Sequence, residues 1–372
     1  MVTVRRLLLV LTVTLCCSGT RPETVSAQDR AEYVLRTLWS VGGLDAPASE
    51  QFSGPFMATA IGPHGEALVL DVNRDLISVF DGRTGRFLRE IGGPGQGPGE
   101  LTSPGAIAWG PGPTLWVAGA FSGRYTLFDS AGVFLRTVPR PFHSVNRLVF
   151  PLAFSPDGKV VDHFGGYPTV RFVRVDTTGV VRDTFPVEVP QLDMLGGGPI
   201  RPGSPLTEVV WLRPILWWTF ARDGRSVWMS RSDSLVLVQV TLRGDTLRRV
   251  VTGHRRGEFT KAQRDAIRRA NHELGREGAF APLLVQAIHG LDDGRLLIQI
   301  GSDMREPGRE FDLFSAEGSL IGSVSAPFRI HHRSELSSRG DTLLLVAVGE
   351  YDVPLLIKAI LERRESDDPG RE

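Results

Sequence analysis

The sequence predicts an all-β fold assembled from repeated four-stranded antiparallel units, and three observations carry this prediction. Short apolar runs alternate along the chain with turns rich in glycine and proline, of which there are 42 and 25. Such a succession of short strands and turn signals is typical of all-β proteins. The order of the runs recurs, and the glycines of the turns keep a nearly constant interval, which indicates an internal repeat.

The first unit shows the pattern most clearly. Apolar runs at residues 56–61, 67–71, 76–81 and 87–91 are separated by short turns, two of which end in Gly65 and Gly85. Each run has the length of a β-strand, and connections this short join antiparallel neighbours. The unit is therefore predicted to be a four-stranded antiparallel meander.

The same order returns in four further copies. The glycine of the first turn and the glycine of the third turn are separated by 20 to 24 residues in every copy. These pairs are Gly65 and Gly85, Gly112 and Gly132, Gly158 and Gly179, Gly224 and Gly244, and Gly294 and Gly318. Because one meander cannot bury both of its faces alone, neighbouring copies have to stack.

A sixth copy begins at Ser334, has its first turn at Gly340-Asp341, and ends in a polar tail before a fourth strand. Residues 33–43 near the N-terminus resemble the fourth strand of the first copy, residues 87–93. The sequence therefore predicts a six-bladed β-propeller of four-stranded antiparallel blades, with the N-terminal strand closing the last blade. Radial stacking of this kind also protects the sheet edges.

The N-terminus has the features of a signal peptide. Arg5 and Arg6 precede a short apolar run at residues 7–15, and Val25-Ser26-Ala27 fits a small-x-small cleavage site. We expect a signal peptide at 1–27, a propeller at 28–365 and a polar tail at 366–372. The alternatives are a retained anchor, or a lipoprotein acylated at Cys16 or Cys17. These are the two cysteines of the chain, so cleavage would leave none for disulfides or catalysis.

Composition narrows the classes of partner. Lys+Arg and Asp+Glu each number 42, so no net field favours nucleic acid or anionic lipid. No later apolar run has the length of a membrane span, and we expect none in the mature protein. The sequence therefore predicts an exported protein, periplasmic, secreted or envelope-associated, that acts as a monomer.

Two long insertions flank the fourth copy, at residues 186–212 and 253–282. The second predicts a helix at about 258–277, because Thr260 and Gln263 form a capping box and an apolar stripe follows at helical spacing. Lysine and arginine occupy its other face. Two interpretations stay open: an amphipathic helix packed over the rim with solvated arginines, or a partial lid whose arginines face an acidic ligand.

The glycine-rich segment at residues 91–101 is followed by Pro104-Gly105-Ala106-Ile107-Ala108. A phosphate loop would need a helix after it, and a β pattern follows instead. The junction closely resembles the connection between blades in NHL-repeat proteins, with Gly110 where that family usually carries Asp. The resemblance implies an NHL-like propeller of the exported bacterial type with a binding role, and it implies no catalytic residues.

The loops after the second strand of each blade share one face of a propeller, and loops on a rigid scaffold commonly bind partners. A solvated rim is the plain alternative. The candidate ligand-binding or partner-binding residues are these loop residues together with Trp211, an aromatic platform in the first insertion: Asp71, Asn73, Arg74, Arg124, His163, Tyr167, Trp211, Arg231, Asp303, Arg305, Glu350 and Tyr351. Trp217, Trp218 and Trp228 are expected mostly in the core.

The favoured function is a non-enzymatic binding scaffold for a protein, peptide or glycan, with no cofactor. No His-Glu-x-x-His spacing is present, and neither Asn-Gly nor Glu-Gly-Pro occurs. The alternative is a metal-dependent hydrolase or lyase with Ca²⁺ or Zn²⁺ at the channel mouth, held by Asp71, Asp303 and Glu350. A structural component of the cell envelope is a third class, since fold alone does not imply function.

Overall fold

The fold is described from a computed structural model. The described residues are 31–364 apart from 55, 143–148, 165–170, 186–203, 210–211, 213–215, 234–235, 252–257, 276, 279, 283, 302–306 and 332–333. They belong to one unit, Ala31–Glu372. The predicted signal peptide at 1–27 and the tail at 366–372 lie outside the described residues and stay predictions. No described helix is long and apolar enough to cross a membrane.

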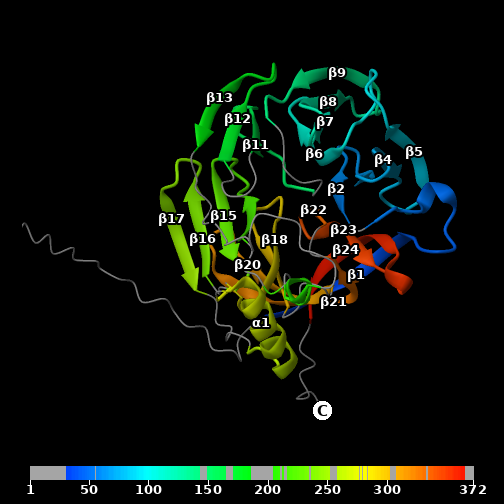
Figure 1. Ribbon diagram of the computed structural model, residues 1–372. Coiled ribbons are helices and arrows are strands. Elements are labelled where there is room, and N and C mark those ends of the chain that lie inside the picture. Colours follow the sequence, from blue (N-terminus) through cyan, green and yellow to red (C-terminus); the bar gives the residue numbers. More distant parts are fainter. Residues whose placement is uncertain are drawn as a thin grey trace, which may run out of the picture. The chain divides into compact units, whose positions relative to one another are not determined.

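Four separate four-stranded antiparallel sheets form most of the unit (Figure 1). Each sheet is a meander in which consecutive strands pair, as the repeat predicts. In chain order the strands are β2(Met57–Ile61), β3(Ala67–Asp71), β4(Leu76–Phe80) and β5(Phe87–Gly92); β6(Pro104–Gly110), β7(Thr114–Gly119), β8(Arg124–Phe128) and β9(Phe134–Pro139); β10(Ala153–Phe154), β11(Val160–Phe164), β12(Arg171–Val175) and β13(Val181–Phe185); and β14(Leu216–Phe220), β15(Ser226–Arg231), β16(Val236–Thr241) and β17(Thr246–Val251).

The remaining strands form a single eight-stranded sheet, in the order β18-β19-β20-β21-β1-β24-β23-β22. Their bounds are β18(Val285–Gly290), β19(Leu296–Ile300), β20(Gly308–Phe314), β21(Leu320–Ile330), β1(Ala31–Gly42), β24(Pro354–Arg363), β23(Thr342–Val348) and β22(Ser337–Arg339). Consecutive strands from β18 to β21 pair antiparallel, and so do those from β22 to β24. The expectation of six separate blades is therefore replaced by four separate sheets and one continuous sheet.

Pairings of β1 and of β21 account for this difference. β1 pairs antiparallel with β24, from Tyr33 opposite Arg363 to Gly42 opposite Leu355, which confirms the predicted closure by the N-terminus. Its first residues, Ala31 to Val34, also pair in parallel with β21. β21 also pairs directly with β23, through Arg329 opposite Val348 and Ile330 opposite Ala347, so both sets of pairings join the two halves into one sheet.

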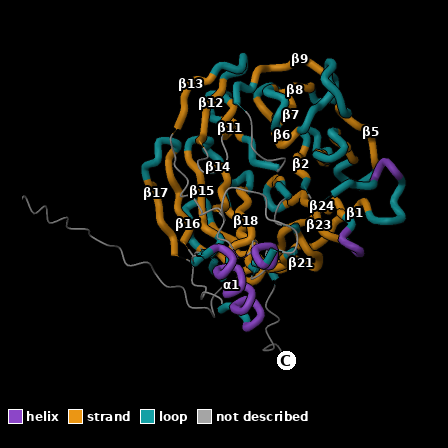
Figure 2. Tube along the Cα trace, viewed as in Figure 1, coloured by secondary structure: helices purple, strands orange, loops and turns teal. Residues whose placement is uncertain are grey.

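The sheets adopt a propeller-like arrangement, with first strands inside and fourth strands outside (Figures 1 and 2). Apolar side chains from adjacent sheets fill the spaces between them. Leu70 and Ile77 of the first sheet pack with Leu115 and Val117 of the second, for example. Trp228 is 1% exposed and packs against β18 and β19, which confirms its predicted place in the core.

The turns between third and fourth strands show why the glycines recur. In the turn at Asp81, the carboxylate accepts hydrogen bonds from the amides of Arg83 and Thr84, and Gly85 adopts a φ of 75°. Asp129 and Asp176 accept the same kind of amide hydrogen bonds in the next two sheets. Glycine reaches positive φ without a steric penalty, so this turn requires it.

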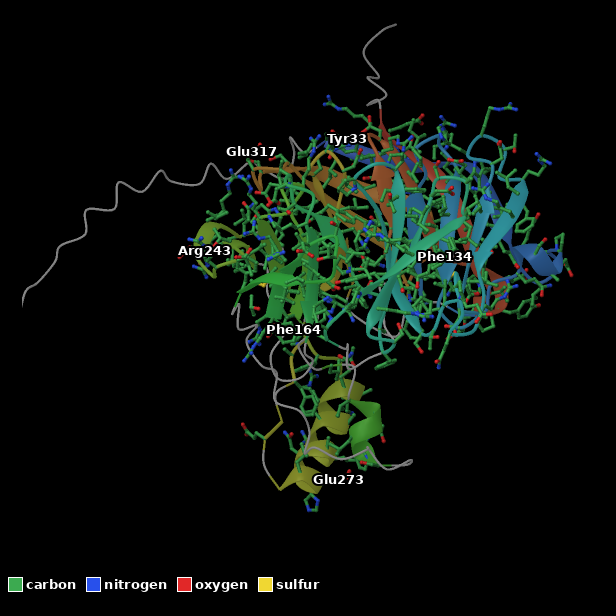
Figure 3. All side chains as sticks on the ribbon, turned by 90° about the horizontal axis from the view of Figure 1, so that it is seen from above. Tyr33, Phe134, Phe164, Arg243, Glu273 and Glu317 are labelled. Carbon is green, nitrogen blue, oxygen red and sulfur yellow. The ribbon has the colours of Figure 1, made fainter. Side chains whose placement is uncertain are left out.

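The predicted helical insertion is present as α1(Lys261–Leu274). Thr260 and Gln263 form both halves of the predicted capping box. The buried side of α1, including Ala266 and Ala270, packs against Val209 and Leu212 of the first insertion and lies beside the short helix η3(Pro205–Glu208). The two insertions therefore share a small apolar cluster, and Figure 3 shows this cluster standing apart from the sheets, with Glu273 on its far side.

The closure by β1 leads to a stability prediction. Leu35 is 1% exposed in the apolar cluster of the eight-stranded sheet, whereas Leu38 of the same strand is 43% exposed. Leu35→Ala should lower the free energy of unfolding by about 2–4 kcal/mol, because it removes buried methyl groups and leaves a cavity. Leu38→Ala should change it by less than about 1 kcal/mol. Urea unfolding measures both, and equal losses would contradict the assignment of β1.

Candidate functional site

A cavity of about 360 Å³ lies where the first strands of the sheets converge, and we call it the central cavity. Its walls include residues of β2, β6, β10, β14, β18 and β22, which span almost the whole described chain. The volume is at the lower end of the range of small-molecule sites in proteins. The cavity can therefore hold a small molecule or a protruding side chain of a larger partner.

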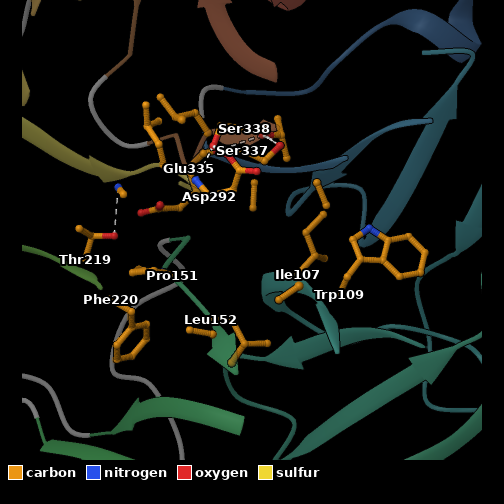
Figure 4. A pocket seen from close by; sticks show the side chains of 18 of the residues that line it. Ile107, Trp109, Pro151, Leu152, Thr219, Phe220, Asp292, Glu335, Ser337 and Ser338 are labelled. Carbon is orange, nitrogen blue, oxygen red and sulfur yellow. Dashed lines mark hydrogen bonds between the residues drawn. The ribbon is translucent and has the colours of Figure 1, made fainter. Parts of the chain in front are cut away.

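The cavity has a polar side and an apolar side (Figure 4). Glu335, Ser337, Ser338 and Asp292 gather on one side, from the segment around β22 and the turn after β18. Apolar side chains of the second, third and fourth sheets form much of the opposite wall, among them Ile107, Leu152 and Phe220. A ligand with one polar end and one apolar end matches this division.

Most polar groups of the cavity already have partners in the protein. The hydroxyl of Thr59 donates to the carbonyl oxygen of Leu344 at 2.9 Å and lies 3.1 Å from the Ser337 hydroxyl. Asp292 accepts hydrogen bonds from the Ser338 hydroxyl at 3.1 Å and the Gly340 amide at 2.9 Å. The Asp292 carboxylate and the hydroxyls of Thr59, Ser337 and Ser338 therefore each take part in at least one hydrogen bond within the protein.

Glu335 differs from these groups. Its backbone is fixed by β2, because its amide donates to the Met57 carbonyl at 2.9 Å and its carbonyl accepts from the Thr59 amide at 3.1 Å. The side chain lines the cavity, deep in the protein and only partly open to solvent. Burial raises the pKa of Glu335 to about 7, since loss of water disfavours the charged carboxylate.

Three of the sequence-predicted site residues lie together at the end of β3, where they support their own loop. The carboxylate of Asp71 accepts hydrogen bonds from the amide and hydroxyl of Ser53, at 2.8 and 2.5 Å, and from the amides of Asn73 and Arg74. Arg74 forms an ion pair with Glu90 at 3.2 Å. Asp71 is buried, and these contacts give it a structural role.

Arg124 binds the glycine-rich segment that separates the first and second sheets. Its guanidinium donates to the carbonyl oxygens of Gln96 at 2.9 Å and Glu100 at 3.1 Å. The segment also closes on itself, because the Leu101 amide donates to the Gly93 carbonyl and the Gly95 amide donates to the Leu101 carbonyl. The segment is a self-bonded crossover between β5 and β6, as the repeat predicts.

His163 belongs to a buried polar cluster between the second and third sheets. Asp162 accepts two hydrogen bonds from the Arg140 guanidinium, at 2.7 and 3.1 Å, and one from the Tyr125 hydroxyl at 2.7 Å. Burial alone would raise the pKa of Asp162, but the Arg140 charge and these hydrogen bonds hold it well below its usual range. The His163 ring packs edge-on against Phe150 and Trp218.

The other described predictions lie on the surface. Arg231 forms a two-point ion pair with Asp233, with both nitrogen–oxygen distances at 2.9 Å. Glu350 and Tyr351 lie in the short helix η5(Glu350–Asp352), where Tyr351 is 78% exposed and has a φ of 53°. Tyr167, Trp211, Asp303 and Arg305 lie outside the described residues. None of the described predicted residues lines the central cavity.

Sequence reasoning passed over Glu335. A usable signal was present, because the sixth repeat begins at Ser334 and the first strand of each repeat is the innermost. A glutamate at the start of such a strand is predicted to face the axis of the ring. The site was predicted at the ends of the second strands instead, because loops on a rigid scaffold commonly bind partners.

Metal chemistry has little support among the described residues. No three or more His, Cys, Asp or Glu side chains there are grouped so that they could hold a metal ion. Both carboxylate oxygens of Asp71, one of the residues of the alternative hypothesis, accept hydrogen bonds from Ser53. Asp303 is outside the described residues, so its part of that hypothesis is not tested.

Comparison with known proteins supports the fold and leaves the activity open. No known protein family matches the chain, and no curated protein does. A member of the DUF4221 family from Bacteroides vulgatus is similar in structure, with a TM-score of 0.54 at 13% identity over 91% of this chain and 100% of the other. A protein from Bacteroides fragilis described as a "putative exported protein" gives 0.51 at 12% identity, over 92% and 98%.

The similarity to the calcium-binding protein regucalcin from Agrobacterium tumefaciens has a TM-score of 0.48 at 12% identity, covering 90% of this chain and 96% of the other. A score at that level supports no inference about function. At these identities the two higher-scoring structures establish the fold alone: an all-β, propeller-like arrangement of four-stranded antiparallel sheets.

The Arg124 contacts predict a local effect. Arg124→Ala should speed amide hydrogen exchange at residues 93–101, because three carbonyl acceptors of the segment lose their donor. The global free energy of unfolding should fall by about 1–2 kcal/mol. Arg86→Ala is the control, since the Arg86 side chain is exposed in the turn between β4 and β5. If amide hydrogen exchange at residues 93–101 is unchanged in the Arg124 variant, Arg124 does not stabilise this segment.

Glu335 leads to a prediction on stability and pH. Its pKa is raised to about 7 in the folded state, so the folded protein holds the proton more tightly than the unfolded chain does. The stability from this group is complete below the ordinary glutamate pKa and is lost as pH rises through about 7.

Relative to Glu335→Gln, the unmodified protein should therefore lose about 2–3 kcal/mol between roughly pH 5 and pH 8. Urea unfolding at both pH values measures this difference. Glu317→Gln, at an exposed turn, should follow the unmodified protein at both. Parallel pH curves for the unmodified protein and the Glu335 variant would show that the carboxyl is not buried as described.

Proposed function

We propose that the chain is an exported, monomeric six-bladed propeller that acts as a binding scaffold and holds its ligand in the central cavity. In this proposal the eight-stranded sheet counts as two blades, β18 to β21 and β22 to β24 with β1. The antiparallel order within each half supports that count. So does the recurrence of the turn glycines in the sequence.

Export is proposed from the N-terminal segment at 1–27, with its basic start, apolar run and small residues before position 28. The description of the similar Bacteroides fragilis protein as exported agrees with it. The ligand is a small molecule, or a group that projects from a protein, peptide or glycan. A binding role also agrees with the resemblance of the sequence to NHL-like propellers of the exported type.

One observation carries the binding proposal: a cavity built by every sheet of the ring, with a polar and an apolar side. The described loop residues predicted from sequence are weaker candidates. The side chains of Asp71, Arg124 and Arg231 are used by contacts within the protein. Glu350 and Tyr351 stay exposed and could contact the outer part of a larger partner.

A metal-dependent hydrolase or lyase, with Ca²⁺ or Zn²⁺, is the second candidate function. It requires a set of carboxylate or histidine ligands, and the described residues offer no such group. The binding scaffold needs no such set and therefore fits the described part of the chain better.

The binding proposal is tested with a library of neutral, cationic and anionic fragments, observed by saturation-transfer NMR on the purified protein. Ala108 lines the cavity, so Ala108→Phe should fill part of it and abolish at least about nine-tenths of the signal from fragments that bind there. Ala131→Phe, at an exposed turn, is the matched control and should leave those signals unchanged.

Circular dichroism and unfolding show whether the Ala108 variant folds, and Ala153→Leu is a milder second variant in the same wall. If fragments bind equally well to the unmodified protein and to folded cavity variants, the ligand site lies elsewhere. A complete absence of binding at millimolar fragment concentration would also overturn the proposal.

A further inference from the structure

The carboxyl group of Glu335 lies on the wall of the central cavity, and the described residues leave its hydrogen bonding incomplete. It forms no hydrogen bond or ion pair with any described residue, although it is deep in the protein. Two buried carboxylates outside the cavity are saturated: Asp71 by Ser53 and the β3 loop, and Asp162 by Arg140 and Tyr125. Burial of a carboxyl without a partner is costly. A bound ligand that supplies the partner would offset that cost.

The position of this carboxyl is held firmly. Two backbone hydrogen bonds between Glu335 and Met57 or Thr59 tie the segment before β22 to the first sheet. The hydroxyls of Thr59 and Ser337 and the carbonyl of Leu344 form one further network beside it. The carboxyl is therefore presented to the cavity by a rigid backbone, as a preorganised binding group requires.

The surroundings determine which ligand the carboxyl can accept. An anion is disfavoured because two carboxylates, those of Glu335 and Asp292, line the cavity against one described arginine, Arg222. A divalent metal ion would need several protein oxygens or nitrogens, and the described residues hold no such group. An organic cation needs only one carboxylate for charge and an apolar wall for its hydrocarbon part, which Leu152, Ile107 and Phe220 provide (Figure 4).

We propose that the central cavity selects an amphiphilic organic amine, whose ammonium group pairs with the Glu335 carboxylate while its apolar part lies against the wall formed by Ile107, Leu152 and Phe220. This inference rests on the proposed function and names the class of ligand. A free amine, or a lysine side chain of a peptide, has the required chemistry.

No other described charged group near Glu335 forms an ion pair with its carboxyl. Those on the cavity wall and on the elements packed against Glu335 are Asp292, Arg222, His289, His331 and Arg339. Arg339 donates to the Gly62 carbonyl at 2.7 Å, and the His331 ring packs edge-on against Phe56. Burial lowers the pKa of His289 to about 4, so it stays neutral near physiological pH.

The charges of the ammonium group and of Glu335 make the affinity for the amine depend on pH. A primary amine of ordinary pKa, about 10, keeps its charge through neutral pH. Glu335 gains its charge only as pH rises through about 7. Amine affinity should therefore increase between roughly pH 5.5 and pH 8, by about tenfold or more.

The test uses three probes of similar size and shape: 2-phenylethylamine, 2-phenylethanol and 3-phenylpropanoate. Calorimetry or NMR titration measures their dissociation constants with the purified protein, Glu335→Gln and the control Glu317→Gln. The amine should bind about tenfold more weakly to the Glu335 variant at pH 8, and that variant should lose the pH dependence. The alcohol should bind both proteins alike, and the Glu317 variant should behave as the unmodified protein.

The outcomes separate the two proposals. If the amine binds the Glu335 variant as tightly as the unmodified protein, or if 3-phenylpropanoate is preferred, the assignment of an amine ligand is wrong. If in that case 2-phenylethanol still binds and Ala108→Phe blocks it, the central cavity remains the binding site. If none of the probes and no fragment of the library binds, the proposed function falls together with the inference.

Discussion

The structure depends on one constraint: every sheet has two apolar faces, and each face has to be covered by a neighbour. Apolar clusters therefore lie between successive sheets, from Leu70 and Leu115 at the first boundary to Trp228 and Ile298 at the fourth. The same constraint brings the end of the chain back to its beginning. Met57, Val69 and Phe80 of the first sheet pack against Leu344, Val346 and Leu356 near the C-terminus. β1 adds hydrogen bonds to β24 at this closure.

The cavity follows from this arrangement. When each sheet turns its first strand inward, the small residues of those strands leave space between them. Ala58, Ala60, Ala108 and Ala153 are examples, from the first three sheets. No single repeat contains the site, and its polar and apolar sides come from opposite parts of the ring. The position of Glu335 between β21 and β22 places on the polar side a carboxyl that has no partner among the described residues.

The contrast among the buried carboxyl groups identifies the functional candidate. Asp162 carries its charge inside the protein because Arg140 and Tyr125 surround it, and such a cluster stabilises the boundary between two sheets only when all its members are present. Glu335 has no comparable set of partners among the described residues. A strongly perturbed carboxyl in a cavity is the kind of group that binding and catalytic sites use. This distinction depends on contacts between distant segments, so residue type alone could not reveal it.

The sequence by itself determined the repeat, the turns, the closure by β1 and the cap of α1. These features depend on local chemistry: glycine at positive φ in the turn after Asp81, and Thr260 with Gln263 at the start of the helix. Only the tertiary structure decided that β1 also pairs with β21, that α1 packs on the other insertion, and that Arg124 binds backbone of the glycine-rich segment. It also decided that the Glu335 carboxyl lines the cavity without a partner in the described part of the chain. Those outcomes depend on which distant segments meet, and the periodicity of a chain specifies strand order but not the partner of each side chain.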